Sequence, residues 1–221
     1  MKRIPFYLLI ILLAFLSPIT GYSQEVIDIT KLSHEDDIGH TVSLFKDESR
    51  LLNIEQVSNA TFIKYQKKRV NLGYNNDNDW IKIKIHNPST NSIDKAVKLS
   101  GLRIAEIELF YQYNGIWNSV TGGGSIPKSQ VIIRGINTYL PFTLPPKETT
   151  TVYLRVKTHN SKVLPLYIIS KNLIPSESNT GFTIFGFIVG GILVITLYNI
   201  FLGISTHDKL YFHYSLANLC Y

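Results

Sequence analysis

Aromatic and cationic side chains are the residues of this sequence whose types suggest ligand chemistry. Proteins hold sugars by placing aromatic rings against their C–H groups and polar side chains near their hydroxyls. Both tryptophans and some tyrosines and arginines fit this description. Core packing also explains a tryptophan, and solvation or a carboxylate partner also explains an arginine. The candidates for ligand binding are Trp80, Trp117, Tyr111, Tyr113, Arg103 and Arg134.

Catalytic and metal-binding groupings have little support in the sequence. Glu106 and Glu108 lie two residues apart and could form a glycosidase-like pair, but alternating charges on a solvated strand give the same pattern. His34 and the pair Asp36–Asp37 lie close together in an expected loop, which is too few residues for a metal ligand set. We therefore expect no enzyme, no metal and no cofactor.

The composition describes a folded chain with few charges. The 221 residues are 45% hydrophobic and 17% charged, with a net charge of +6. This apolar content excludes a disordered chain, and the single cysteine, Cys220, excludes a disulfide scaffold and a thiolate zinc site. The densest basic group, residues 64–69, is interpreted as a solvated face, so no nucleic-acid partner is expected.

The first 23 residues resemble the layout of a secretory signal peptide. Lys2 and Arg3 precede an uncharged run over 6–16, and small residues stand just before Gln24. An uncleaved anchor is the alternative, but the run is shorter than the roughly 20 residues that span a bilayer. Cleavage after Ser23 would leave a chain that begins at Gln24 on the outer side of the membrane.

A second apolar block predicts a transmembrane helix over residues 181–204. The run 181–203 carries no charge and would reach about 34 Å as a helix, enough for a hydrocarbon core of about 30 Å. Residues 175–180 form a short linker before it, and 205–210 form a cytoplasmic turn after it. Residues 211–221 then begin a second, truncated membrane helix, so we expect a fragment of a polytopic protein.

Small and polar residues in this block suggest helix packing. Gly186 and Gly190 form a GxxxG match, although glycine is common in membrane helices. Asn199 carries an amide that favours a helix partner over lipid. We therefore expect membrane lipid and other transmembrane helices, or a second copy of the chain, as partners.

Residues 24–174 predict an exported β-domain. In the segment 80–86, Ile81, Ile83 and Ile85 share one face, and the other face carries Trp80, Lys82, Lys84 and His86. Asn114-Gly115 predicts a hairpin, and residues before 70 are less regular. The fold class is an all-β jelly-roll-like sandwich followed by a transmembrane α-helix that starts a helical bundle. The expected strands are 80–86, 95–100, 104–113, one beginning at 117, 130–133, 138–144, 150–158 and 164–170.

Several of these segments together resemble a bacterial receptor family, the seven-transmembrane receptors with diverse intracellular signalling modules (7TM-DISM). The segment 79–89 (DWIKIKIHNPS) is similar to one strand of the family's type 2 extracellular domain, and 104–111 and 152–156 are similar to two others. Residues 197–202 and 207–214 resemble its first two membrane helices. The sequence departs from the pattern in having lysine where arginine is usual in the first strand, and a less basic cytoplasmic turn.

The resemblance implies a jelly-roll domain that binds carbohydrate or a similar small ligand outside the cell. The expected function is the extracytoplasmic, ligand-sensing portion of a signal-transduction receptor. We expect it in the inner (cytoplasmic) membrane as a single- or multi-pass protein, with its N-terminal domain periplasmic or extracellular. Any kinase or cyclase activity would belong to an intracellular module that this chain lacks. The alternative is a membrane-anchored adhesion or scaffolding sandwich without signalling. The reading frame beyond Tyr221 would distinguish the two.

Overall fold

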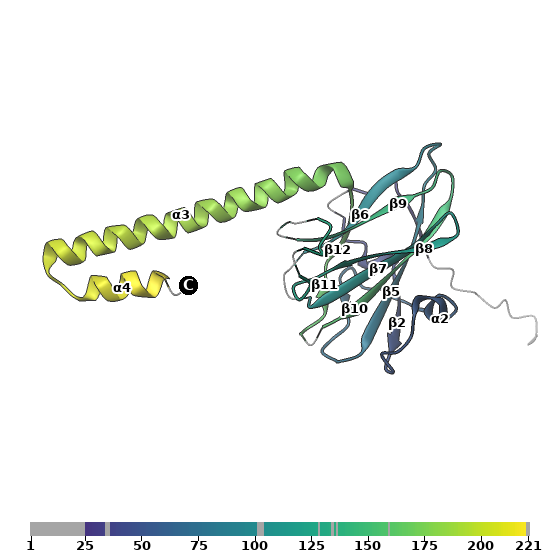
Figure 1. Ribbon diagram of the computed structural model, residues 1–221, viewed down its shortest axis with the longest axis horizontal. Helices are drawn as coiled ribbons and strands as arrows, with labels where there is room; N and C mark the ends of the chain where they lie inside the picture. Colours follow the sequence, from purple (N-terminus) through teal and green to yellow (C-terminus); the bar gives the residue numbers. More distant parts are fainter. Residues whose placement is uncertain are drawn as a thin grey trace, which may run out of the picture.

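The structure is a computed structural model that describes residues 25–33, 36–100, 104–127, 129–133, 135, 137–158 and 160–219. Two stacked, mainly antiparallel sheets form a sandwich, and a long helix extends away from it (Figure 1). The predicted signal peptide, Arg103, Arg134 and the end of the chain lie outside the described residues. The expected sandwich followed by an apolar helix is confirmed.

The larger sheet contains seven strands in the order β3-β2-β5-β10-β7-β8, with β1 pairing in parallel beside β5. Strand β5 is central because it pairs with β10 along one edge and with β2 and β1 along the other. The strands are β1 (Val26–Asp28), β2 (Ser43–Asp47), β3 (Ile63–Lys64), β5 (Asn78–His86), β7 (Glu106–Tyr113), β8 (Ile116–Gly122) and β10 (Thr149–Lys157).

The smaller sheet has the order β12-β6-β9, and successive strands of the chain cross repeatedly between the two sheets. Pro165 lacks the amide hydrogen that a β-ladder needs and separates β12 from the short strand β11. The strands are β6 (Ile93–Leu99), β9 (Thr138–Leu144) and β12 (Leu166–Ser170), with β4 (Val70–Asn71) and β11 (Val163–Leu164) as a separate pair.

The main core lies between the sheets and follows the predicted alternation. Ile81, Ile83 and Ile85 are fully buried there, opposite Leu140 and Leu144 of β9. The Asn114-Gly115 hairpin also forms, with φ values of 52° and 77° that suit a tight two-residue turn between β7 and β8.

Two regions differ from the expectation. Residues 130–133 form turns instead of a strand, because the Gln130 amide donates to Pro127 O at 2.8 Å and Ile132 is exposed. The region before residue 70 is more regular than expected. It includes η1 (Gly39–Thr41) and α2 (Ile54–Ser58), whose first turn is closed by a capping box between Asn53 and Gln56.

The sandwich passes directly into helix. The turn η2 (Lys171–Leu173) leads into α3 (Ile174–Thr206), so the predicted linker at 175–180 forms the first turns of this helix. The stretch 171–206 is long and apolar enough to cross a membrane. The helix ends at His207, whose φ of 56° reverses the chain, and α4 (Leu210–Leu219) folds back beside α3 (Figure 1).

Candidate functional site

The outer face of the larger sheet, which points away from the smaller sheet, carries an aromatic cluster. Trp80, Phe110 and Tyr153 project from β5, β7 and β10 because they alternate with core residues along each strand. The short helix α2 and its flanking residues pack on this cluster through Val57 and Phe62. This second core gives the outer face a rigid floor.

A hollow of about 430 Å³ lies on this face, at the end where the β7–β8 hairpin meets the turn between β9 and β10. The ring of Trp117 is partly exposed and lies edge-on to Tyr153, with ring centres 5.9 Å apart. The residues that line the hollow are Ser58, Gln112, Asn114, Gly115, Trp117, Pro145, Glu148, Thr149, Thr150, Thr151 and Tyr153.

The lining combines one accessible aromatic ring with amides and hydroxyls. Gln112, Asn114 and the threonines of β10 can both donate and accept hydrogen bonds. Glu148 is the one charged side chain among the lining residues, and no ion pair is present for it within the described part of the chain. Such a surface suits an uncharged ligand with many hydroxyl groups.

Two ionisable side chains on the outer face near the hollow, Tyr153 and Lys82, have shifted pKa values. Burial raises the pKa of the Tyr153 hydroxyl above its ordinary value, so this group remains a neutral phenol. Lys82 lies over the rings of Phe62 and Tyr153, at 5.1 and 5.8 Å from their centres. Burial, with the nearby Lys84 acting in the same direction, lowers the pKa of the Lys82 ammonium.

Trp117 is the predicted ligand residue that reaches this hollow, and Trp80 does not. The Trp80 ring is fully buried, stacked on Phe110 with ring centres 5.6 Å apart and covered by the Arg155 guanidinium at 5.5 Å. Trp80 is therefore a packing residue, which corrects the expectation that it contacts a ligand. The alternation in β5 had placed it on the outer face but could not show that α2 and Arg155 would cover that region.

Tyr111 and Tyr113 lie on the opposite side of the sheet from Trp117. Tyr111 packs toward the main core, edge-on to Phe142 at 6.2 Å between ring centres. Burial raises the pKa of its hydroxyl, and the charge of Asp94 acts in the same direction. Of the predicted ligand residues within the described chain, the structure thus leaves Trp117 alone in the hollow, joined by Gln112 and the β10 threonines, which the sequence did not single out.

The suspected carboxylate pair forms cross-strand ion pairs. Glu108 pairs with Arg155, and Glu106 pairs with Lys157 at 2.7 Å. Both glutamates lie on the outer face of β7, opposite β10, as alternating charges on paired strands predict. Within the described ranges no group of three His, Cys, Asp or Glu side chains could hold a metal ion, and His34 lies outside those ranges.

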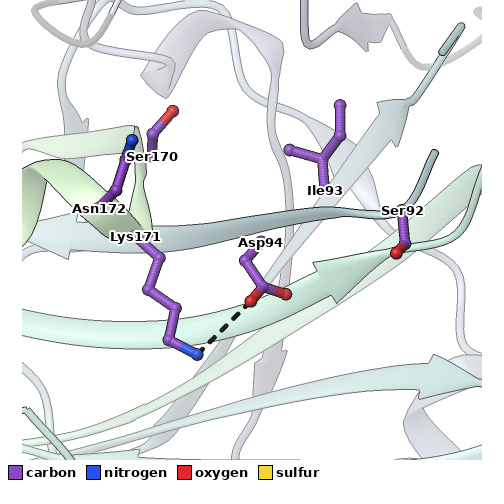
Figure 2. Close-up of a pocket in the computed structure, with 6 residues that line it drawn as sticks. All are labelled: Ser92, Ile93, Asp94, Ser170, Lys171 and Asn172. Atoms are coloured by element: carbon purple, nitrogen blue, oxygen red, sulfur yellow. Dashed lines mark ion pairs between the residues drawn. The ribbon is translucent and has the colours of Figure 1, made fainter.

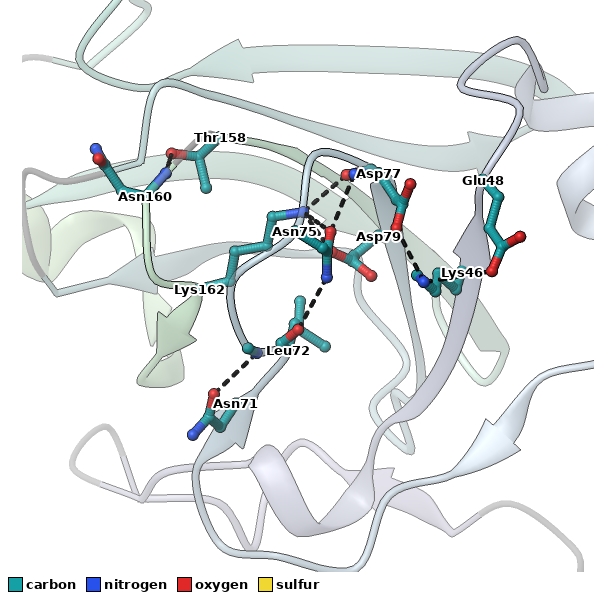
Figure 3. Close-up of polar contacts among 11 residues, drawn as sticks. Lys46, Glu48, Asn71, Leu72, Asn75, Asp77, Asp79, Thr158, Asn160 and Lys162 are labelled. Carbon is teal, nitrogen blue, oxygen red and sulfur yellow. Dashed lines mark hydrogen bonds and ion pairs between the residues drawn. The ribbon is translucent and has the colours of Figure 1, made fainter.

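A buried lysine near one end of the sandwich was not anticipated. Lys162 is fully buried, and its ammonium donates to Asn75 Oδ1 at 2.8 Å, Asp77 O at 2.7 Å and Asp79 Oδ2 at 2.5 Å (Figure 3). These three bonds tie the start of β5 and the loop before it to the segment after β10. In the sequence Lys162 resembles any surface lysine, so no signal could have identified it.

The root of α3 is anchored to the smaller sheet. Ile174 is buried against Ala96, Tyr139 and Ile169, and the Glu177 carboxylate accepts two hydrogen bonds from Lys98. On the other side of the root, Lys171 lies 3.6 Å from Asp94 beside a shallow hollow of about 490 Å³ (Figure 2). Its other lining residues are Ser92, Ile93, Ser170 and Asn172.

The predicted helix-packing glycines face open space within the described chain. A side chain added at Gly186 or Gly190 would meet no atom within 4 Å. Gly203 is instead the point where α3 approaches α4, because a Cβ there would lie 2.8 Å from the Phe212 ring. Asn199 bonds back to Ile195 O at 2.9 Å, half-exposed on the helix surface.

Comparisons with solved structures find β-sandwich proteins at low identity. One is TmCBM61 in complex with beta-1,4-galactotriose (11% identity, 60% of this chain, 90% of that chain, TM-score 0.34). A second is from a study of carbohydrate-binding modules of the β-sandwich superfamily (13% identity, 66% of this chain, 61% of that chain, TM-score 0.30). A third is the GH115 4-O-methyl-alpha-glucuronidase BtGH115A (11% identity, 57% of this chain, 16% of that chain, TM-score 0.27). No curated protein matches the sequence.

A family profile supplies the assignment that these structures do not. The profile described as "7TMR-DISM extracellular 2" matches residues 39–170, which span the sandwich from η1 to the end of β12. This range includes the aromatic outer face and the hollow, and it ends where the turn into α3 begins. The chain therefore belongs to the 7TMR-DISM extracellular 2 family.

Proposed function

We propose that this chain is the ligand-sensing portion of a signal-transduction receptor in the inner membrane, with the sandwich in the periplasm. Membership in a family of receptor extracellular domains supports the sensing role, and the apolar helix supports membrane attachment. The signal-peptide layout of residues 1–23 supports export. The output module lies in the intracellular part of the receptor.

The proposed ligand is a small carbohydrate bound in the hollow beside Trp117. The observation that carries this proposal is the partly exposed Trp117 ring, set among amides and hydroxyls on a rigid aromatic floor. A sugar ring would stack its C–H face on the indole while Gln112 and Thr151 bond to its hydroxyls. Signalling then requires that the ligand bind one arrangement of domain and helices more tightly than another.

The binding test uses the full chain in detergent micelles and a panel of neutral hexose trimers. We expect at least one trimer to bind with saturable calorimetric heats, and we expect Trp117→Ala to abolish the heat. The matched control is Ile116→Ala, because Ile116 is the neighbouring exposed residue on the opposite face of β8. Equal binding by the Trp117→Ala variant would show that the hollow is not the site.

A further inference from the structure

The rim of the hollow and the root of α3 are connected by one continuous set of contacts. The turn between β9 and β10 (residues 145–148) contributes Pro145 and Glu148 to the hollow. The same turn is bonded to the turn between β5 and β6 (residues 87–92). This second turn leads directly into β6, on which α3 is seated.

Asn87 holds the two turns together from a fully buried position. Its amide nitrogen Nδ2 donates to Pro145 O at 2.8 Å and to Asn91 O at 2.9 Å, while its Oδ1 accepts from Ser89. Two backbone bonds add to this link, from Asn87 N to Glu148 O at 2.9 Å and from Lys147 N to Ser89 O at 3.0 Å. A displacement of one turn must therefore move the other or break several buried bonds.

Strands β6 and β9 carry this link to the membrane helix. They are paired from Ile93 and Leu144 at the turn end to Leu99 and Thr138 at the other, and the Lys98–Tyr139 pair lies five residue steps from the Ile93–Leu144 pair. This distance is about 17 Å for five residue steps. At the far end Lys98 bonds to Glu177 at 3.0 Å, and Tyr139 donates to the same carboxylate at 3.4 Å.

We propose that the two bonded turns and the β6–β9 pair couple the hollow to α3, with Asn87 at one end and the Glu177–Lys98 pair at the other. Ligand contact at the β9–β10 turn changes how α3 is seated on the smaller sheet. This inference rests on the proposed ligand site. Coupling between two sites is reciprocal, so loosening the root of α3 must also loosen the turn at the hollow.

The test measures amide hydrogen exchange in the full chain in micelles without ligand. Lys98→Met breaks the pair with Glu177, and the expected result is exchange about fivefold faster or more at the Lys147 and Asn87 amides. The matched control is Lys157→Met, which breaks the ion pair with Glu106 on the larger sheet. That control should leave the two reporter amides unchanged.

A second variant keeps the test decisive if Lys98→Met unfolds the domain. Ser89→Ala removes one bond to Asn87 and should speed exchange in the first turn of α3, including the Glu177 amide. Exchange at the core residue Ile83 reports global unfolding and must stay slow in each variant. Acceleration confined to the region around each substitution would overturn the coupling.

These experiments can contradict the ligand proposal without contradicting the coupling proposal, and the reverse. If no sugar binds but exchange at the two ends is linked, the ligand class is wrong and the coupling stands. If a sugar binds in a Trp117-dependent manner while the two ends exchange independently, the site stands and the coupling is wrong.

Discussion

Glu177 on α3 and Lys98 on β6 form a two-bond ion pair, with Nζ 3.0 Å from both carboxylate oxygens. Their side chains are only 22% and 14% exposed, so solvent screens this pair less than an ordinary surface pair. Burial raises the pKa of the neighbouring Tyr139 hydroxyl, and the Glu177 carboxylate acts in the same direction. The sandwich and the helix therefore meet at a packed, hydrogen-bonded joint.

A flexible insertion after this joint should uncouple sensing from output. Inserting about ten Gly/Ser residues between Thr180 and Gly181 leaves Ile174 and Glu177 seated but replaces rigid helix with flexible chain. In the full receptor we expect ligand binding to persist and the ligand-dependent output to be lost. The same insertion in the exposed 66–68 loop is the control. Normal output from the first variant would argue against transmission through a rigid joint.

Trp80 and Trp117 should differ in how much each contributes to the free energy of unfolding. Trp80→Ala removes a fully buried ring and should lower the free energy of unfolding by about 3–5 kcal/mol. Trp117→Ala removes a partly exposed ring, so we expect a smaller loss of about 1 kcal/mol. Urea unfolding followed by circular dichroism measures both changes. A larger loss at Trp117 than at Trp80 would contradict the assignment of one to the floor and the other to the site.

Substitution of the buried Lys162 should destabilise the sandwich more than substitution of an exposed lysine. Lys162→Met leaves Asp79 buried without its partner, and removing one member of a buried ion pair costs about 3–5 kcal/mol. Lys31→Met, which breaks the more exposed pair with Asp28, should leave the unfolding midpoint nearly unchanged. Urea unfolding of the two variants is the comparison. Equal midpoints would show that water replaces the ammonium without cost.

Much of the sandwich could be predicted because its signals are local. Alternation identified the faces of β5, and Asn114-Gly115 specified a two-residue hairpin. The 138–144 strand was predicted with its observed bounds. The run 130–133 has the apolar composition of a strand, but it makes its own turn and leaves Ile132 exposed.

The site was harder to predict because it depends on contacts between distant segments. Trp80 and Trp117 are the same residue type on the outer face of the same sheet, and the packing of α2 and Arg155 buries the first while the second stays partly exposed. The partners of Lys162 and Glu177 lie 83 and 79 residues away in the chain. No periodic pattern within a single segment can reveal such pairs.

The close contact between α3 and α4 should depend on Gly203. Gly203→Ile would drive a side chain into the Phe212 ring, whereas Gly190→Ile enters open space within the described chain. The contact can be measured by disulfide formation between cysteines placed at Thr196 and Ser215, with Cys220 replaced by serine. These positions face each other across the two helices, because the Ser215 hydroxyl donates to Thr196 O at 3.3 Å. We expect Gly203→Ile to slow cross-linking and Gly190→Ile to leave it unchanged. The reverse order would place the helix contact elsewhere.

Burial of Tyr153 predicts a loss of stability at alkaline pH. Its folded-state pKa lies above the ordinary value of 10.0, whereas the unfolded chain titrates near that value. Below pH 10 both states hold the proton and stability does not depend on this group. As the pH rises above 10, the unfolded state releases its proton first, so the folded state loses stability until it too ionises.

Tyr153→Phe should therefore flatten the dependence of unfolding free energy on pH above 10, while Tyr74→Phe, at an exposed position, should leave it as it is. Identical slopes for the Tyr153→Phe variant and the unmodified chain would mean that the phenol is solvated, and that the floor beneath Trp117 is open to water.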